Sequence, residues 1–153
     1  MTALEAFEAI ASLRRSVERV EEAIAEAHAA AGPRGQAMGS IGGCGHSDAM
    51  APIDSLLDSD AYAELERMRG ELIARTDRAT DVLYGRSGRG GLARHDLVGA
   101  DVLCCHYLMG IAYTEIGRML DPDTPAPYHF CRDRARRACR AIDRIGADVL
   151  ADS

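Results

Sequence analysis

The side chains with the clearest chemical potential are arginines grouped in the last third of the chain. Between residues 125 and 144 there are six arginines and two aspartates, although the whole chain carries a formal net charge of -6. The six are Arg132, Arg134, Arg136, Arg137, Arg140 and Arg144. A planar guanidinium donates paired hydrogen bonds to phosphates and to the edge of guanine. We therefore expect this segment to meet an anionic partner, with nucleic acid as the first candidate.

The spacing of apolar residues predicts that these arginines lie on one helix, from about residue 125 to residue 146. We expect Thr124 to cap the helix, Pro125 to take its first position and Pro127 to lie in its first turn. Apolar residues at steps of three and four form the expected buried side, namely Tyr128, Cys131, Ala135, Ala138, Ile142 and Ile145. The opposite side is the face that we expect to contact DNA.

The candidate DNA contacts divide into two groups, because the start of a recognition helix usually meets base edges and the rest meets phosphates. To base edges we assign Thr124, Ala126, His129, Phe130, Asp133 and Arg134. To phosphates we assign Arg132, Arg136, Arg137 and Arg140, and Tyr113 of the preceding helix completes the candidate set. Substituting Arg134 or Arg137 by Ala is expected to weaken DNA binding without unfolding. The alternative is a solvated charged face on a purely structural helix.

Two shorter helices are predicted just before the arginine helix. The first spans about 96–109 with a wide apolar stripe, and Gly110 is placed to end it. The second spans about 112–120, where Gly117 allows a close approach and Glu115 is expected to reach back to the free amides at the helix start. Two short helices, a turn and a basic third helix make the layout of a helix-turn-helix.

The N-terminal half reads as an acidic helical hairpin. Residues 1–84 hold 15 acidic residues against 8 arginines. Apolar residues in a heptad pattern predict a coiled-coil-like helix over about 2–30, a Gly-rich loop follows at 31–47, and a second helix runs from near 52 to 84. The apolar seam needs a partner helix, which is either internal or a second copy in a homo-oligomer.

The expected architecture is therefore all-α, with the hairpin at 1–84 and the helix-turn-helix at 94–153. The Gly-rich stretch 85–93 is interpreted as a solvated linker between them. Its alternative is a mobile basic arm, since Arg86 and Arg89 have the charge to contact the DNA backbone.

No other chemistry has a convincing pattern. Cys44 and His46, like Cys104 and His106, lack the paired spacing of a structural zinc site. The acidic residues Asp54, Asp58, Asp60 and Glu64 are interpreted as a solvated helix face rather than a metal site. Because no nucleotide-binding loop or nucleophile motif is present, we expect no enzyme activity, no cofactor and no metal. With neither a membrane span nor a signal sequence, the expected location is the cytoplasm, with reduced cysteines.

The segment from Val102 to Cys139 resembles region four of bacterial sigma factors. The matching residues are Tyr107, Gly110, Glu115, Ile116, Gly117, Leu120, Thr124, Tyr128, Arg134, Ala135 and Arg136. The whole chain is similar to phage and prophage transcription regulators of the ArpU and RinA type, whose central stretch is echoed by residues 38–48. The resemblance implies binding to promoter-region double-stranded DNA and control of phage genes, through or alongside RNA polymerase.

The sequence thus favours a sequence-specific DNA-binding transcriptional regulator of phage or mobile-element origin. Two other functions stay open. One is a phage packaging or replication accessory protein, which would also use a helix-turn-helix with coiled helices. The other is a helical interaction module that uses the same fold against a protein and never meets nucleic acid.

Overall fold

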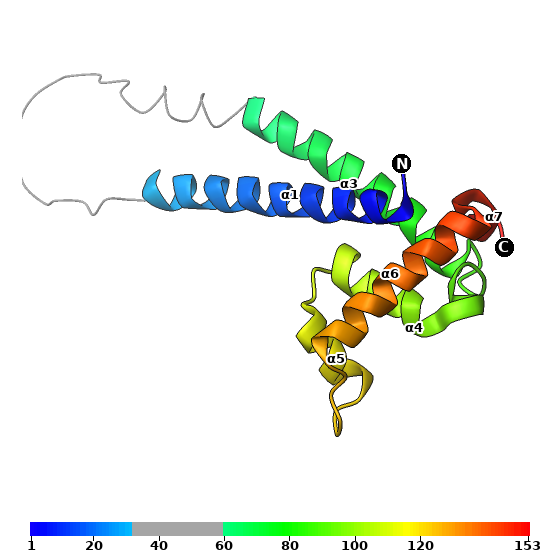
Figure 1. Cartoon of the computed structure of the whole chain (residues 1–153). Helices are drawn as coiled ribbons and strands as arrows, with labels where there is room; N and C mark the ends of the chain where they lie inside the picture. Colours follow the sequence, from blue (N-terminus) through cyan, green and yellow to red (C-terminus); the bar gives the residue numbers. More distant parts are fainter. Residues whose placement is uncertain (32–59) are drawn as a thin grey trace, which may run out of the picture. The chain divides into compact units, whose positions relative to one another are not determined.

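The structure, a computed structural model, describes residues 1–31 and 60–153, and within these ranges every regular element is a helix. The elements are α1 (Ala3–Ala31), α3 (Asp60–Tyr84), α4 (Ala93–Leu103), the π-helix η1 (Cys104–Leu108), α5 (Tyr113–Leu120), α6 (Tyr128–Ile145) and α7 (Ala147–Ala151). Figure 1 shows them along the chain. The all-α prediction is confirmed. The Gly-rich loop, apart from Ala31 at the end of α1, lies outside the described residues, as does the expected start of the second helix near residue 52.

The helices form two compact units. One unit combines Met1–Arg14 with Glu71–Ser153, and the other is Arg15–Gly70. Both α1 and α3 therefore contribute to each unit. This division differs from the expected hairpin at 1–84 and separate domain at 94–153, because the first turns of α1 and the last turns of α3 share a core with the C-terminal helices.

In the unit Arg15–Gly70, α1 and α3 are antiparallel. The hydroxyl of Tyr62 lies 2.6 Å from Nε2 of His28, and Arg69 pairs with Glu21 at 2.7 Å, so residues later in α1 meet residues earlier in α3. Val17 and Leu65 are buried here. The apolar seam of α1 thus has an internal partner.

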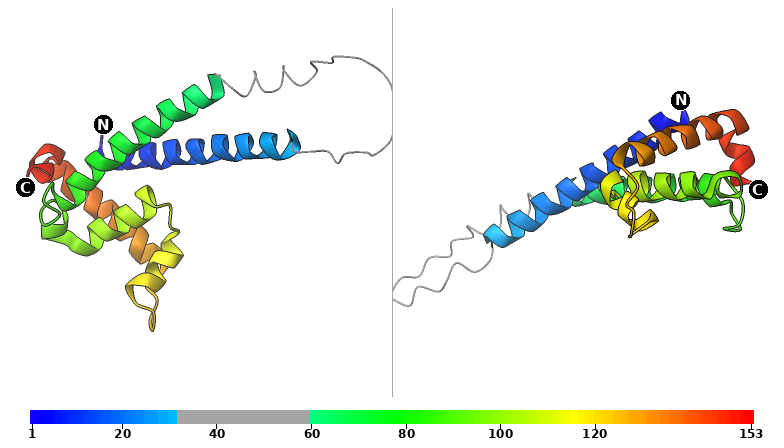
Figure 2. Two further views of the ribbon diagram at one scale, coloured as in Figure 1. Left: turned by 180° about the vertical axis from the view of Figure 1, so that it is seen from behind. Right: turned by 60° about the horizontal axis from the view of Figure 1, so that its bottom comes forward.

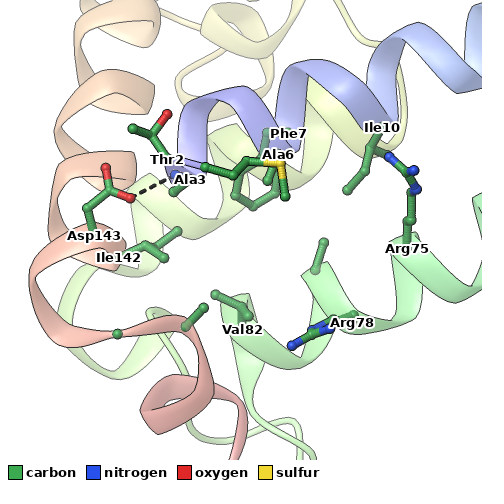
Figure 3. A pocket seen from close by; sticks show the side chains of 14 residues that line it. Thr2, Ala3, Ala6, Phe7, Ile10, Arg75, Arg78, Val82, Ile142 and Asp143 are labelled. Carbon is green, nitrogen blue, oxygen red and sulfur yellow. Dashed lines mark hydrogen bonds between the residues drawn. The ribbon is translucent and has the colours of Figure 1, made fainter.

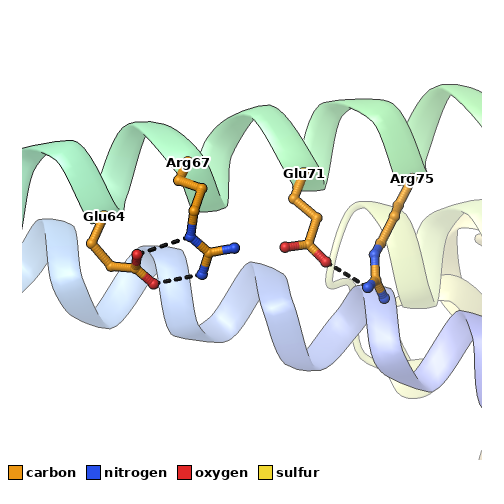
Figure 4. A network of polar contacts seen from close by, with 4 residues as sticks. All are labelled: Glu64, Arg67, Glu71 and Arg75. Atoms are coloured by element: carbon orange, nitrogen blue, oxygen red, sulfur yellow. Dashed lines mark hydrogen bonds and ion pairs between the residues drawn. The ribbon is translucent and has the colours of Figure 1, made fainter.

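Along α3, arginine–glutamate pairs at helical spacing recur, as Figure 4 shows for Glu64–Arg67 and Glu71–Arg75. Such exposed pairs stabilise a helix only slightly.

In the larger unit, the core joins the two ends of the chain. Phe7 of α1 and Val82 of α3 are buried with Ile116 of α5 and Ile142 of α6. Helices α4 and α6 pack against each other, and α7 follows α6 at the C-terminal end, as both views in Figure 2 show. No helix within residues 1–31 and 60–153 has the length and apolar character needed to cross a bilayer.

The segment 85–93 is a packed turn rather than the solvated spacer that we expected. Leu92 is fully buried, and its N–H donates to the carbonyl oxygen of Val82 at 2.9 Å. Gly91 has a φ of 62°, and a Cβ there would lie 2.6 Å from the backbone nitrogen of Gly85. Because the turn closes this tightly, it holds the start of α4 against the end of α3.

The expected helix 96–109 is two elements. After Leu103 the chain widens into the π-helix η1, and Gly110 then ends it with a φ of 78°, as predicted. A π-turn adds a residue to the turn and rotates the positions that follow. Met109, the last residue of the expected helix, is exposed, whereas Tyr107 is buried against Phe7.

Substituting Gly117 by Ala is expected to destabilise the larger unit by about 2 kcal/mol or more. A Cβ at Gly117 would lie 2.0 Å from the carbonyl oxygen of Ala126, so the turn after α5 would have to move. The matched control is Gly70→Ala in α3, where a Cβ meets nothing within 4 Å and helix propensity predicts a gain of up to about 1 kcal/mol. Chemical denaturation measures both, and a neutral Gly117→Ala would show that the close approach is absent.

Candidate nucleic-acid interface

The turn between α5 and α6 contains three prolines and is held together by the side chain of Asp121. Oδ1 of Asp121 accepts the N–H of Asp123 at 3.1 Å and that of Thr124 at 3.0 Å. The N–H of Ala126 donates to the carbonyl oxygen of Gly117 at 3.0 Å. These bonds use the backbone donors that the turn offers and dock it on α5, which is the close approach predicted for Gly117.

Helix α6 begins at Tyr128, with Pro127 as its N-cap residue, so the prediction that Thr124 caps this helix was wrong. The reason is local. Thr124 and Ala126 each precede a proline, and a residue in that position is disfavoured from helical backbone angles. Thr124 is therefore an exposed residue of the turn. Glu115 likewise does not reach back to the start of α5, because its carboxylate pairs with Arg118 at 3.1 Å.

The buried side of α6 is shorter than predicted, and four of its five buried residues are small. Cys131, Ala135, Ala138 and Ile142 are buried as expected, and Cys139 joins them. Tyr128 and Ile145 were expected in the core but are 50% and 37% exposed. The small side chains bring α6 close to α4, since a Cβ on Gly99 would lie 3.0 Å from the Cβ of Ala138.

The outer side of α6 presents five of the eleven predicted DNA contacts as exposed side chains. His129 and Phe130 are exposed near its start, and Arg136, Arg137 and Arg140 are exposed further along. Within residues 1–31 and 60–153, none of these three guanidiniums forms an ion pair with a carboxylate. Arg144 extends the same face and lies beside Arg140, to whose carbonyl oxygen its Nε donates at 3.4 Å.

Arg134 does not belong to this free group. Its Nη2 donates to Oδ1 of Asp96 at 2.5 Å, and the two side chains are only 31% and 19% exposed. The same carboxylate oxygen accepts the N–H of Gly99 at 2.8 Å. Asp96 has φ of -152° and ψ of 80°, so it breaks the helical path and caps the part of α4 that follows. One carboxylate therefore starts a helix and anchors α6 on it.

Four other predicted contacts are partly or fully buried, namely Arg132, Asp133, Tyr113 and Ala126. Arg132 lies 3.3 Å from Asp133 and 5.8 Å from the centre of the Tyr128 ring. Tyr113 is buried, and its ring stacks on His106 with centres 3.7 Å apart. Tyr113 thus supports the packing of α5 on η1 rather than offering a surface. Ala126 is half-buried in the turn.

Burial sets the ionisation of the groups beneath this face. Removal from water raises the pKa of the Tyr113 hydroxyl above its ordinary range. It also raises the pKa of the Cys139 thiol to about 12, with the charges of Asp143 and Glu8 acting in the same direction. Both groups therefore stay neutral at physiological pH.

The described residues contain no candidate metal site. Nowhere in 1–31 and 60–153 do three His, Cys, Asp or Glu side chains lie close enough together to hold an ion. Cys44, His46, Asp54 and Asp58 lie outside the described residues. Comparisons with family models, curated proteins and solved structures give no match to this chain.

Sequence reasoning missed Asp96 as a partner of Arg134. The signal was present in part, because an Asp three residues before Gly99 at the start of an apolar run is typical of a helix N-cap. The pairing across 38 positions of sequence has no such local signal.

Arg134→Ala is expected to lower the free energy of unfolding by about 2 kcal/mol, because it leaves the Asp96 carboxylate partly buried without its cation. This corrects the expectation that the substitution spares the fold. A double-mutant cycle with Asp96→Ala, measured by urea denaturation, is expected to give a coupling energy of about 1 to 3 kcal/mol. If the two substitutions had additive effects on the free energy of unfolding, the interaction between Arg134 of α6 and Asp96 of α4 would be contradicted.

Stability is expected to fall as pH rises above about 9. Between pH 9 and the raised pKa of about 12, the Cys139 thiol is ionised in the unfolded chain but protonated in the folded one. The folded state then binds more protons, so raising the pH favours unfolding, by at most about 1.4 kcal/mol per pH unit for one group. Urea denaturation at pH 8 and pH 10 measures the loss, which Cys139→Ala should reduce; an equal loss in the variant would exclude this thiol.

Proposed function

We propose that this chain is a sequence-specific DNA-binding transcriptional regulator that uses α5, the turn 121–127 and α6 as a helix-turn-helix. The observation that carries the proposal is the outer side of α6, where Arg136, Arg137 and Arg140 are exposed on a helix whose opposite side is fixed in the core. A rigid row of free guanidiniums is suited to the regularly spaced phosphates of a duplex.

The start of α6 supplies the groups for reading bases. His129 and Phe130 are exposed there, and Thr124 is exposed in the preceding turn. An imidazole and a hydroxyl exchange hydrogen bonds with base edges, and an aromatic ring packs on the methyl group of thymine. Arg134 is reassigned from base contact to positioning, because it holds the helix that carries these groups.

The resemblance to sigma region four extends the proposal to promoter DNA of a phage or mobile element and to contact with RNA polymerase. In this proposal the protein acts in the cytoplasm and catalyses no reaction. Self-association through the N-terminal helices is part of the same proposal, and the exposed Ile73 of α3 is available for it.

A helical protein-interaction module is the second candidate function. The observation that favours it is a set of apolar side chains exposed around the same turn, namely Met119, Leu120, Tyr128 and Phe130. Exposed apolar groups close together mark protein interfaces as well as base contacts. A module of this kind would show no affinity for duplex DNA even at low salt.

Arg137→Ala combined with Arg140→Ala is expected to weaken binding to duplex DNA while leaving the helix content unchanged, since both side chains are exposed. If four arginines contact phosphates, the logarithm of the binding constant should fall with the logarithm of salt concentration with a slope of about −3.6. Losing two contacts should reduce that slope to about −1.8. Fluorescence anisotropy on a mixed-sequence duplex at several salt concentrations measures both.

The matched control is Arg19→Ala, which removes an exposed guanidinium from α1 and should leave the slope unchanged. Equal affinity of the double variant and the parent protein would contradict the assignment of this face. Absence of any binding by the parent protein at low salt would favour the protein-interaction module.

A further inference from the structure

A second site lies in the larger unit, away from the free arginines of α6. It is a pocket of about 660 Å³ between the start of α1, the end of α3 and the junction of α6 with α7. Figure 3 shows the side chains that surround it. Pockets of a few hundred Å³ are the size that small organic ligands occupy in proteins.

The wall of the pocket is mainly apolar. Phe7 and Ile10 come from α1, Val82 from α3 and Ile142 from α6. Small residues also line the pocket, including Ala6 of α1 and Ala147 of α7. An alkyl chain placed here would be removed from water, which is favourable in proportion to the area covered.

Charge is distributed unevenly around this apolar wall. Arg75 and Arg78, one turn apart on α3, stand on one side, and Asp143 of α6 stands on the other. Asp143 is already engaged, since its Oδ1 accepts the N–H of Ala3 at 2.7 Å. An anionic group in the pocket would therefore be attracted by the two arginines of α3 and repelled by Asp143 of α6.

The two arginines have donors to spare. Arg78 meets Asp148 at 3.4 Å with side chains that are 78% and 90% exposed, and such a pair is weak in water. Arg75 uses one terminal nitrogen for Glu71, at 2.5 Å, whereas a guanidinium has five N–H donors. A carboxylate that arrives with an apolar chain can thus be bound by Arg78, and by Arg75 beside it, without breaking a strong interaction.

We propose that this pocket binds a medium-chain monocarboxylate, with the carboxylate at Arg75 and Arg78 and the alkyl chain along Phe7, Val82 and Ile142. The head group is recognised by charge and the chain by apolar contact. Asp143 disfavours a second carboxylate at the far end. The proposal does not depend on DNA binding, because the pocket does not include Arg136, Arg137 or Arg140.

The test is isothermal titration calorimetry with decanoate, kept below its micelle concentration. We expect saturable binding that is about tenfold tighter than that of decanol, which lacks the charge, and also tighter than that of the dicarboxylate decanedioate. Equal affinity for decanol and decanoate would overturn recognition of the carboxylate. No binding of either would overturn the site.

Two variants complete the test. Arg78→Gln, at an exposed position, is expected to weaken decanoate about tenfold and to leave decanol unchanged. The double variant Arg137→Ala with Arg140→Ala removes two guanidiniums outside the pocket and is expected to bind decanoate as the parent protein does. Weakening in the double variant but not in Arg78→Gln would place decanoate on the α6 face and overturn the proposal. Retained decanoate binding together with lost DNA binding would separate the two functions.

Discussion

The carboxylate of Asp96 is the constraint on which the C-terminal arrangement depends. One of its oxygens accepts the N–H of Gly99 and also the guanidinium of Arg134, so the same group starts the regular part of α4 and fixes α6 on it. Gly99 makes this possible, because a Cβ there would lie 2.4 Å from the second carboxylate oxygen. A charge-assisted bond at a partly buried place is stronger and more specific than an exposed ion pair.

The Arg134–Asp96 ion pair determines which arginines of α6 remain exposed. Arg134 pairs with Asp96 of α4 and is partly buried, whereas Arg136, Arg137 and Arg140 are exposed to solvent. The small residues on the buried side let α6 lie close to α4. The side that faces outward is consequently presented on a rigid support, which is what a surface for phosphates or base edges requires.

In the part of the chain that the structure describes, charged side chains are paired with one another along α3 but not on the exposed side of α6. Acidic and basic residues along α3 neutralise one another at helical spacing, as in Glu64–Arg67 and Glu71–Arg75. In α6, Arg136, Arg137 and Arg140 form no ion pair with a carboxylate among the described residues, although Asp133 and Asp143 lie at helical spacing from them. The net charge of -6 is therefore a poor guide to partners, since local charge and not the sum determines what a surface attracts.

The sequence by itself determined the helical class, the helix over 3–31, the stop at Gly110 and the exposure of Arg137 and Arg140, because periodicity and glycine stereochemistry act over a few residues. It did not determine the π-turn at Cys104–Leu108, the burial of Tyr113 or the pairing of Arg134 with Asp96. Tyr113 is buried where α5 packs on η1, and the Arg134–Asp96 pair joins positions 38 residues apart, so neither feature follows from local spacing alone. Only the tertiary structure decides which side of a charged helix is held inward, since that choice rests on the partner that the neighbouring helix supplies.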